Sequence, residues 1–430
     1  MTSEPLAETA RARFSPGTAR AALAQHDFRR LYLSTFASSV GSWMQTVVVG
    51  PLALRLGGES FVGLLMFANF GPILVLSIPA GALAAKLSNR RRYMIGVQCM
   101  QIMFATFLAL VAANGTPNKW LLLLGVLGGG TMNSLNGPVS QSLMPDIVGR
   151  ENIPAAVSLG SAQMNGSRVV GPVALALISQ LVHITPSMVF MFNAITFLTV
   201  IWALATIHVP AVPERTAEVI GFRSLGVGFR ELGVNPVARR VLGIMFAFSL
   251  LCLAYVTQFP SLAEGLLGMN SQKKNYLFMF GVWGFGALCG ALSMSTVLAK
   301  VDKRPLPRRL LIGFGLVMAV WSTQRSPSLF VHAVLLALGF FYFGTTTALN
   351  TLLQQSLSSA RRPYVMSLWF MCFGGTIPIA GLWAGWLMES SLGARTGAMV
   401  VLLIGAAVAT ILAFFGDLRS VGSQAIPIAH

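Results

Sequence analysis

Charged residues, and acidic ones above all, are scarce in this chain. Only 10% of its 430 residues are charged, and Asp and Glu together number 13. A soluble domain usually carries about 25% charged residues, because its surface must be wetted. The shortage excludes a large water-exposed surface, and the 55% share of hydrophobic residues indicates that most of the exterior faces lipid. A chain of this length accommodates about a dozen spans of roughly 20 apolar residues each.

Nucleotide-binding loops and catalytic constellations are also lacking. The cysteines lie singly in apolar stretches, at Cys99, Cys252, Cys289 and Cys372, which excludes a disulfide framework and a cysteine metal site. No Gly-x-x-x-x-Gly-Lys-Ser/Thr loop occurs, so an ATP-driven pump is not expected. No paired carboxylates, Ser–His pair or histidine pair falls at membrane depth, which argues against an enzyme. We therefore expect no enzymatic activity, no metal and no cofactor.

The net charge of +17 does not indicate nucleic-acid binding. A DNA-binding face would gather Lys and Arg on a folded polar domain, whereas here the basic residues lie in every second loop. Of the 30 basic residues, 23 fall on one side of the expected membrane, six on the other, and one, Arg168, inside a span. Positive residues concentrate in cytoplasmic loops. Both termini are therefore predicted to be cytoplasmic, in a multi-pass protein of the cytoplasmic (inner) membrane.

The apolar runs predict an all-α polytopic membrane protein with twelve transmembrane helices. In lipid every backbone amide must be hydrogen-bonded within its own segment, so helices are the expected spanning structure. The expected spans are 30–54, 61–84, 94–113, 119–142, 154–182, 187–209, 241–263, 275–298, 309–325, 328–352, 363–388 and 395–416. They predict an N-terminal cytoplasmic segment, a six-helix bundle, a cytoplasmic linker, a second six-helix bundle and a cytoplasmic tail, at 1–29, 30–209, 210–240, 241–416 and 417–430.

The linker and an internal repeat favour a division into two related halves. Apolar residues recur at helical spacing in the linker, at Phe222, Leu225, Phe229 and Leu232. This pattern favours an amphipathic helix on the anionic inner leaflet; a disordered tether is the alternative. The expected spans four and ten end in the same triplet, at Gln141-Ser142-Leu143 and Gln355-Ser356-Leu357. Two six-helix repeats are typical of transporters that rock one half against the other.

The loop after the expected span two reads Gly81-Ala-Leu-Ala-Ala85-Lys86-Leu-Ser-Asn-Arg90-Arg91-Arg92. It resembles the Gly-x-Leu-Ala-Asp-Arg-x-x-Arg-Arg signature of the major facilitator superfamily. The segments 144–159 and 165–172 resemble the loop between spans four and five, and span five itself, in the prokaryotic efflux branch of enterobactin-exporter-like and drug-exporter-like proteins. The resemblance covers essentially the whole chain. It implies the major facilitator fold, with two pseudo-symmetric six-helix bundles, and a monomeric transporter that works by alternating access.

The chain departs from the family pattern in two places. Ala85 and Lys86 stand where the signature has Asp and Arg, so the carboxylate that helps to latch the cytoplasmic side in relatives is missing. Span five keeps the Gly-Pro core of the antiporter motif, at Gly171 and Pro172. The flanking glycines of that motif are replaced, by Ser167, Leu175 and Ala176.

Arg168 is the candidate with the clearest physical signal. It lies near the middle of the expected span five, where an arginine costs roughly 2.5–3.5 kcal/mol unless it faces a cavity or a partner. It shares a helical stripe with Ser161 and Asn165. One interpretation is a hydrogen-bond donor to an anionic or carbonyl-bearing substrate. The other is a structural tie between span five and backbone carbonyls of a neighbouring helix.

Polar stripes also occur on the spans that surround the central cavity in the superfamily. The candidates for the substrate path are Ser38, Ser42 and Gln45, beside Thr35, in span one, Asn133 and Asn136 in span four, Gln258 in span seven, and Thr347 and Thr351 in span ten. Such stripes also serve as contacts between helices, so both interpretations stay open. The pair Gly286 and Gly290 predicts a close approach of two helices.

The leading hypothesis is a secondary transporter that exports an amphiphilic small molecule, drug-like or siderophore-like, in exchange for protons. Proton coupling usually needs a carboxylate within the membrane, and the nearest candidates lie at span ends, at Asp27, Glu59, Glu264 and Glu389. A lysolipid flippase, an uncoupled facilitator and a non-transporting membrane sensor are alternatives, because a fold does not fix a function. The expected partners are the small-molecule substrate, membrane lipids and protons, and no nucleic acid.

Overall fold

The chain is helical almost throughout the part that the computed structural model describes. That part comprises residues 18–76, 79, 89–148, 152–208, 222–271, 274–295, 298, 301–357, 361–390 and 392–418, and it contains no strand. The α-helices are α2 (Ala19–Ala24), α3 (His26–Phe70), α5 (Arg90–Ala112), α6 (Lys119–Ile147), α7 (Ile153–Leu181), α8 (Pro186–Thr206), α9 (Phe222–Val234), α10 (Pro236–Ala247), α11 (Ala254–Thr257), α12 (Phe259–Leu267), α13 (Lys274–Ser295), α14 (Leu306–Ser322), α15 (Leu329–Gln355), α16 (Arg362–Phe370), α17 (Thr376–Glu389) and α18 (Ala394–Phe415).

The described residues of the predicted spans fall largely on these helices, and residues 77, 78 and 80–84 of the second predicted span lie outside the described part. Among the described residues, seven helices are long and apolar enough to cross a membrane, or eight when the bent pair α9 and α10 counts as one span. One of the seven, α3, carries the first predicted span and the start of the second. The break between them falls at Gly57 and Gly58, and Gly58 has a φ of +69°. Glycine adopts this left-handed conformation at no steric cost, so this position fixes where the chain turns back.

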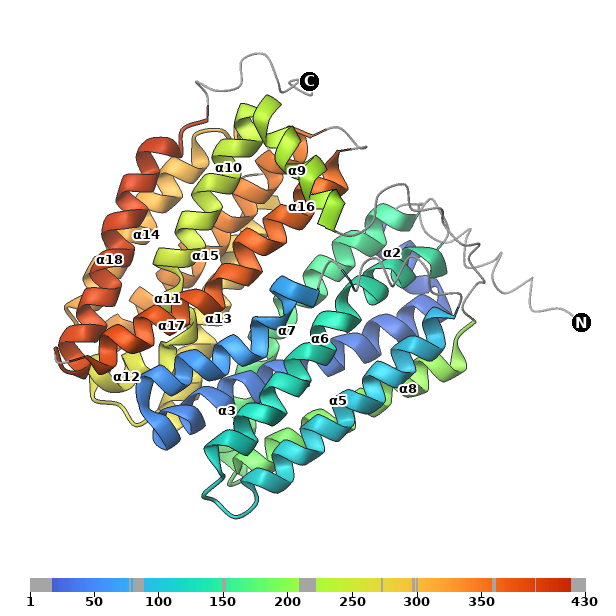
Figure 1. The fold of residues 1–430 in the computed structure, drawn as a ribbon, viewed down its shortest axis with the longest axis horizontal. Coiled ribbons are helices and arrows are strands. Elements are labelled where there is room, and N and C mark those ends of the chain that lie inside the picture. Colours follow the sequence, from blue (N-terminus) through green and yellow to red (C-terminus); the bar gives the residue numbers. More distant parts are fainter. Residues whose placement is uncertain are drawn as a thin grey trace, which may run out of the picture. The chain divides into compact units, whose positions relative to one another are not determined.

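The N-terminal unit comprises residues 1–46 and 75–220. Within it α5 packs against both α6 and α8 (Figure 1). Helix α2 packs on α7, beside a core cluster that includes Phe28, Leu31, Met94 and Leu204. Burial of these apolar side chains holds the ends of the helices together.

The C-terminal unit comprises residues 47–74 and 221–430. Figure 1 shows α14 running alongside α18, and these two helices are in contact, as are α13 and α15. The core of the unit is aromatic, with Tyr255 fully buried between Trp283 and Trp321 in edge-to-face geometry. The Trp283 Nε1–H donates to the Tyr255 hydroxyl over 3.1 Å, which satisfies both buried polar groups. Residues 47–74 belong by sequence to the predicted first bundle, yet they pack within this unit.

Helices α13 and α15 approach each other through glycines. A Cβ placed on Gly286 would lie 2.0 Å from the Leu336 carbonyl oxygen, and one on Gly290 would lie 2.2 Å from the Phe340 carbonyl oxygen. From the opposite helix, a Cβ on Gly339 would lie 2.1 Å from the Trp283 carbonyl oxygen. The predicted packing role of Gly286 and Gly290 is confirmed, because only hydrogen at these positions lets the backbones come this close.

Two π-helical segments interrupt the helices that carry the predicted spans seven and eleven, at Phe248–Cys252 and Met371–Gly375. Side chains join the two interrupted helices. The Ser249 hydroxyl donates to the Phe373 carbonyl over 2.8 Å, and the Trp383 Nε1–H donates to the Leu250 carbonyl over 2.9 Å. A π-helical turn leaves carbonyls without their usual intrahelical partners, and these two bonds supply substitutes.

The linker contains the predicted helix, since α9 covers Phe222–Val234; residues 209–221 lie outside the described part. Helix α9 packs on α16, with Gly228 against the Tyr364 carbonyl. Glu231 on α9 forms an ion pair with Arg361, with 3.8 Å between Oε2 and Nε. Phe229 is 60% exposed, so α9 presents an apolar side chain outward, as an interfacial helix does.

Candidate functional site

Arg168 lies on α7 over an aromatic ring of α3, within the N-terminal unit. Its guanidinium carbon is 5.1 Å from the centre of the Trp43 ring, and the side chain is half-buried. A cation over the face of an indole is stabilised by roughly 0.5–2 kcal/mol, more when it is desolvated. The stack fixes the position of this positive charge beside an aromatic ring, and a guanidinium is the group that binds planar anions and carbonyls.

The Gly-Pro pair of span five fixes the distance between the two helices that carry this stack. A Cβ on Gly171 would lie 2.8 Å from the Trp43 Cβ and 2.9 Å from the Val40 carbonyl oxygen. Gly171 and the adjacent Pro172 are both buried. The glycine therefore lets α7 and α3 approach closely, one turn from Arg168, and the approach holds Trp43 beneath the guanidinium.

Asn193 on α8 connects two of the predicted span-one residues. Its side-chain Nδ2 donates to the Gln45 Oε1 over 2.8 Å, and its Oδ1 accepts from the Ser42 hydroxyl over 3.4 Å. Asn193 is buried, and so is Ser38, one turn before Ser42 on α3. These contacts join α3 to α8, which is the inter-helix use of a polar stripe.

Thr35 belongs to a second polar group on the same helix. The Thr35 hydroxyl lies 3.2 Å from the Gln163 Oε1 on α7, and the Gln163 Nε2 donates to the Ser39 hydroxyl over 3.4 Å. The stripe on span one, which the sequence predicts as one continuous face, is thus shared between two neighbours, α7 and α8. Ser161 and Asn165 lie in α7, and their side chains are outside the described part.

The predicted residues of spans four and ten differ in their surroundings. Asn136 is half-buried, and its Oδ1 accepts from the Gln98 Nε2 over 3.4 Å, whereas Asn133 is exposed. On α15 the Thr351 hydroxyl donates to the Thr347 carbonyl within the same helix. Thr347 and Thr351 are half-buried, so their side chains are accessible in part.

Gln258 is fully buried where α11 meets α12, and all of its side-chain polar atoms are bonded. Its Nε2 donates to the Glu59 carbonyl over 3.0 Å and to the Gly381 carbonyl over 2.9 Å. Its Oε1 accepts from the Ser261 hydroxyl over 2.8 Å. One side chain thus ties α3, α12 and α17 together, and both of its N–H donors are used within the protein.

Replacing Gln258 by leucine is expected to destabilise the protein by about 3 kcal/mol. The change leaves the Glu59 and Gly381 carbonyls and the Ser261 hydroxyl buried without a partner, and each such group costs about 1–3 kcal/mol. Thermal unfolding in detergent measures the effect. Gln354→Leu, at an exposed glutamine on α15, is the matched control. Equal melting temperatures for the two variants would show that Gln258 does not have this packing role.

The basic cluster after span two begins helix α5. Arg90 is buried, Arg91 donates to the Ala205 carbonyl at the end of α8, and the Asn89 side chain caps the helix by accepting from the Arg92 amide. Gly81 and Lys86 lie outside the described residues. In the C-terminal unit, Arg239–Arg240, Arg308–Arg309 and Arg361 likewise lie where helices of the odd-numbered predicted spans begin. We call these helix starts the basic end of each unit.

Three of the four acidic candidates, Asp27, Glu264 and Glu389, accept hydrogen bonds through their carboxylates. The Asp27 carboxylate accepts from the His208 amide over 3.0 Å, and Glu389 accepts from the Ser60 amide over 3.1 Å. Glu264 accepts from both the amide and the hydroxyl of Ser271.

Three contributors to the site were missed from the sequence: Trp43, Gln163 and Asn193. Asn193 has a usable signal, because it is an isolated amide in the strongly apolar segment 187–209, and a buried amide requires partners. Gln163 and Trp43 have no comparable signal. Glutamine and tryptophan occur at many positions in membrane helices, so only the contact identifies them.

Known protein families and sequences match this chain over most of its length. Residues 17–428 match a major facilitator family described as transmembrane secretion effector. The chain is 22% identical over 361 residues to the staphyloferrin A transporter of Staphylococcus aureus, covering 82% of this chain and 87% of the relative. It is 26% identical over 348 residues to the enterobactin exporter EntS of Escherichia coli, covering 79% of this chain and 78% of the relative.

Two solved structures show the same fold at low sequence identity. A variant of the nucleoside transporter NupG superposes with a TM-score of 0.72 at 12% identity, covering 90% of this chain and 98% of the other. A bacterial homolog of the human lysosomal transporter Spinster superposes with a TM-score of 0.64 at 15% identity, covering 93% of this chain and 100% of the other. The predicted twelve-helix major facilitator fold is therefore confirmed.

Proposed function

Because the chain belongs to the transmembrane secretion effector family of the major facilitator superfamily, we propose that it exports a siderophore-like or drug-like amphiphile across the cytoplasmic membrane. The chain is a transporter and not an enzyme, because its family and its relatives are transporters. The relatives named for staphyloferrin A and enterobactin support a siderophore-like substrate. The excess of basic residues at one end of the helices supports cytoplasmic placement of that end and of both termini.

The observation that carries the proposal is the stack of Arg168 on Trp43. The 5.1 Å pair offers a fixed positive charge beside an aromatic surface. An amphiphile with anionic or carbonyl oxygens and a planar apolar part suits both halves of the pair. The half-buried polar residues Asn136, Thr347 and Thr351 supply further donors and acceptors that alternating access can present in turn.

Proton coupling is part of the proposal. A carboxylate that changes charge during the cycle is the usual coupling element, and Asp27 and Glu264 are the candidates, at opposite ends of their units' helices. Asp27 is the stronger one, because its oxygen Oδ1 lies 3.2 Å from the Nδ1 of His26, which places a second polar group beside the carboxylate.

Uptake into everted membrane vesicles tests the function. We expect vesicles that contain the protein to accumulate a labelled, metal-free siderophore or an anionic or zwitterionic drug only when a proton gradient is imposed. Dissipating the gradient with a protonophore should abolish the accumulation. Vesicles prepared without the protein are the control.

The other outcomes point to different functions. Accumulation that ignores the gradient would replace coupled export by uncoupled facilitation. Movement of a labelled lysolipid between leaflets, with no accumulation of soluble amphiphiles, would make the protein a flippase. Binding of a compound without any flux would make it a sensor.

A further inference from the structure

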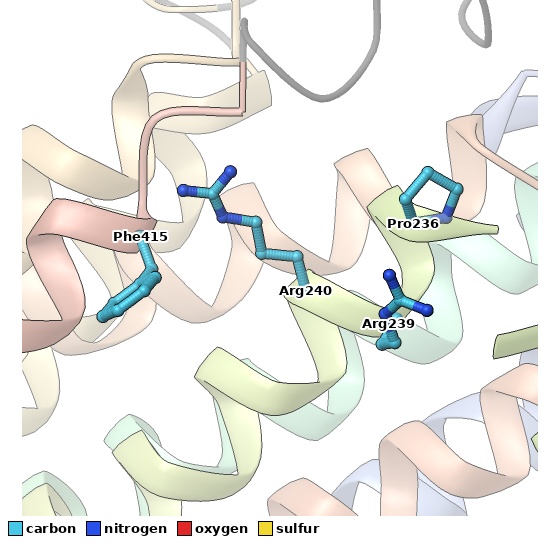
Figure 2. A pocket seen from close by; sticks show the side chains of 4 residues that line it. All are labelled: Pro236, Arg239, Arg240 and Phe415. Carbon is cyan, nitrogen blue, oxygen red and sulfur yellow. The ribbon is translucent and has the colours of Figure 1, made fainter. Parts of the chain in front are cut away.

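An open pocket of about 470 Å³ lies at the basic end of the C-terminal unit, between the start of α10 and the end of α18. It is lined by Pro236, Arg239, Arg240 and Phe415. Figure 2 shows Arg240 extending from α10 toward Phe415, while Arg239 lies on the side of Pro236. The pocket is distinct from the stack of Arg168 and Trp43, which belongs to the N-terminal unit.

The two arginines bring positive charge to the pocket without a carboxylate to balance it. Among the described residues, neither Arg239 nor Arg240 forms an ion pair, and the nearby acids are engaged elsewhere, Glu231 with Arg361 and Asp417 with Arg308. The Arg240 guanidinium carbon is 5.9 Å from the centre of the Phe415 ring.

The second observation concerns the Nε atom of Arg240. It is buried, and it has no hydrogen-bond partner within the part of the chain that the structure describes. A buried donor left unpaired destabilises the folded protein. Such a donor calls for an acceptor from outside the chain, and the paired positive charges select an anionic one.

Exposed apolar side chains beside the pocket indicate what kind of molecule carries the acceptor. Side chains that follow the arginines along α10 and α18 are large, apolar and exposed: Phe246 is 48% exposed, Ile411 56% and Phe414 73%. Phe246 lies seven residues after Arg239, on the same stripe of α10. A charged head at the helix end with an exposed apolar stripe beneath it matches a phospholipid, whose phosphate sits at the interface and whose acyl chains run alongside.

We propose that this pocket binds the phosphate group of an anionic phospholipid, with Arg239 and Arg240 as donors and the α10–α18 surface as the acyl-chain path. The basic end of the C-terminal unit is thereby anchored to one leaflet. The proposal is independent of the exported substrate. It rests on basic pockets between transmembrane helices being suited to acidic headgroups.

Native mass spectrometry of the full chain released from nanodiscs tests the proposal. The nanodiscs contain phosphatidylcholine with an equal part of phosphatidylglycerol, and the readout is the number and kind of lipids retained. We expect the wild type to retain one phosphatidylglycerol selectively. The double variant R239Q/R240Q is expected to bind it about thirtyfold more weakly, since each basic residue near the surface contributes about 1 kcal/mol and 1.4 kcal/mol is a factor of ten.

The controls separate this site from general charge. The double variant K303Q/R309Q removes the same charge from the basic end of α14 and should retain phosphatidylglycerol as the wild type does. R239K/R240K keeps the charge and reports whether the arginine fork is needed. Equal retention by wild type and R239Q/R240Q would overturn the proposal.

Two measurements on the wild type alone test the proposal without depending on how well the variants fold. Its retention of phosphatidylglycerol should fall as ionic strength rises, because salt screens an interfacial charge pair. If inorganic phosphate stabilises the detergent-solubilised wild type and nanodiscs show no preference for phosphatidylglycerol, the ligand is a free anion and the lipid assignment is wrong.

Discussion

Arg168→Gln is expected to lower gradient-driven export between tenfold and a hundredfold while leaving the protein folded. Hydrogen bonds to a charged group contribute about 1.5–3 kcal/mol, and each 1.4 kcal/mol is a factor of ten. The variant removes the charge and the fork of donors over Trp43 but keeps an amide of similar reach. The measurement is the initial rate of uptake into everted vesicles, normalised to the amount of inserted protein.

Two further variants separate the contribution of the charge to the export rate from that of the stacking geometry. Arg168→Lys keeps the charge as a compact ammonium group that cannot bind bidentately, so we expect an intermediate rate. Trp43→Leu removes the ring and should lower the rate less than Arg168→Gln does. Arg230→Gln, at an exposed arginine on α9, is the matched control for loss of charge. If Arg168→Gln exports at the wild-type rate and only its melting temperature falls, the arginine is a structural tie between helices.

The spans could be predicted from the sequence because lipid leaves the backbone a single solution. Segments of about 20 apolar residues must be helical, and the printed sequence shows where they begin and end. The break in α3 at Gly57–Gly58 falls in the predicted gap between the first two spans, because that gap separates two apolar runs. The π-helical segments at Phe248–Cys252 and Met371–Gly375 could not be predicted. They depend on bonds between distant side chains and carbonyls, such as Ser249 to Phe373.

The predicted polar residues could be located but not grouped. Helical spacing places Thr35, Ser42 and Gln45 near one face of span one, and the sequence contains no information on which helix each one meets. The structure assigns Thr35 to α7 through Gln163, and Ser42 and Gln45 to α8 through Asn193. Gln258 illustrates the same difficulty. A lone glutamine in an apolar span fits a binding site or a packing contact equally well, and only its three satisfied hydrogen bonds distinguish the two.

Gly286→Val is expected to cause the largest loss of stability among single substitutions on α13. A Cβ at this position would lie 2.0 Å from the Leu336 carbonyl oxygen and 2.7 Å from its carbonyl carbon. Both atoms are backbone, so no side chain can move aside, and α13 has to separate from α15. Overpacking usually costs about 1–3 kcal/mol; here we expect about 3 kcal/mol or more, because the neighbouring contacts at Gly290 and Gly339 open as well.

The control for this prediction is Gly243→Val on α10. A Cβ on Gly243 meets no atom within 4 Å, so this variant carries the same change of residue without the clash. In membrane helices packing contacts supply much of the association energy, since lipid provides no hydrophobic drive between apolar helices. We therefore expect Gly286→Val to lower the melting temperature in detergent by about 5 °C or more, with Gly243→Val close to the wild type. Similar melting temperatures for the two variants would show that α13 and α15 are not held by this glycine contact. A loss confined to Gly286→Val would identify the α13–α15 pair as the rigid element of the C-terminal unit.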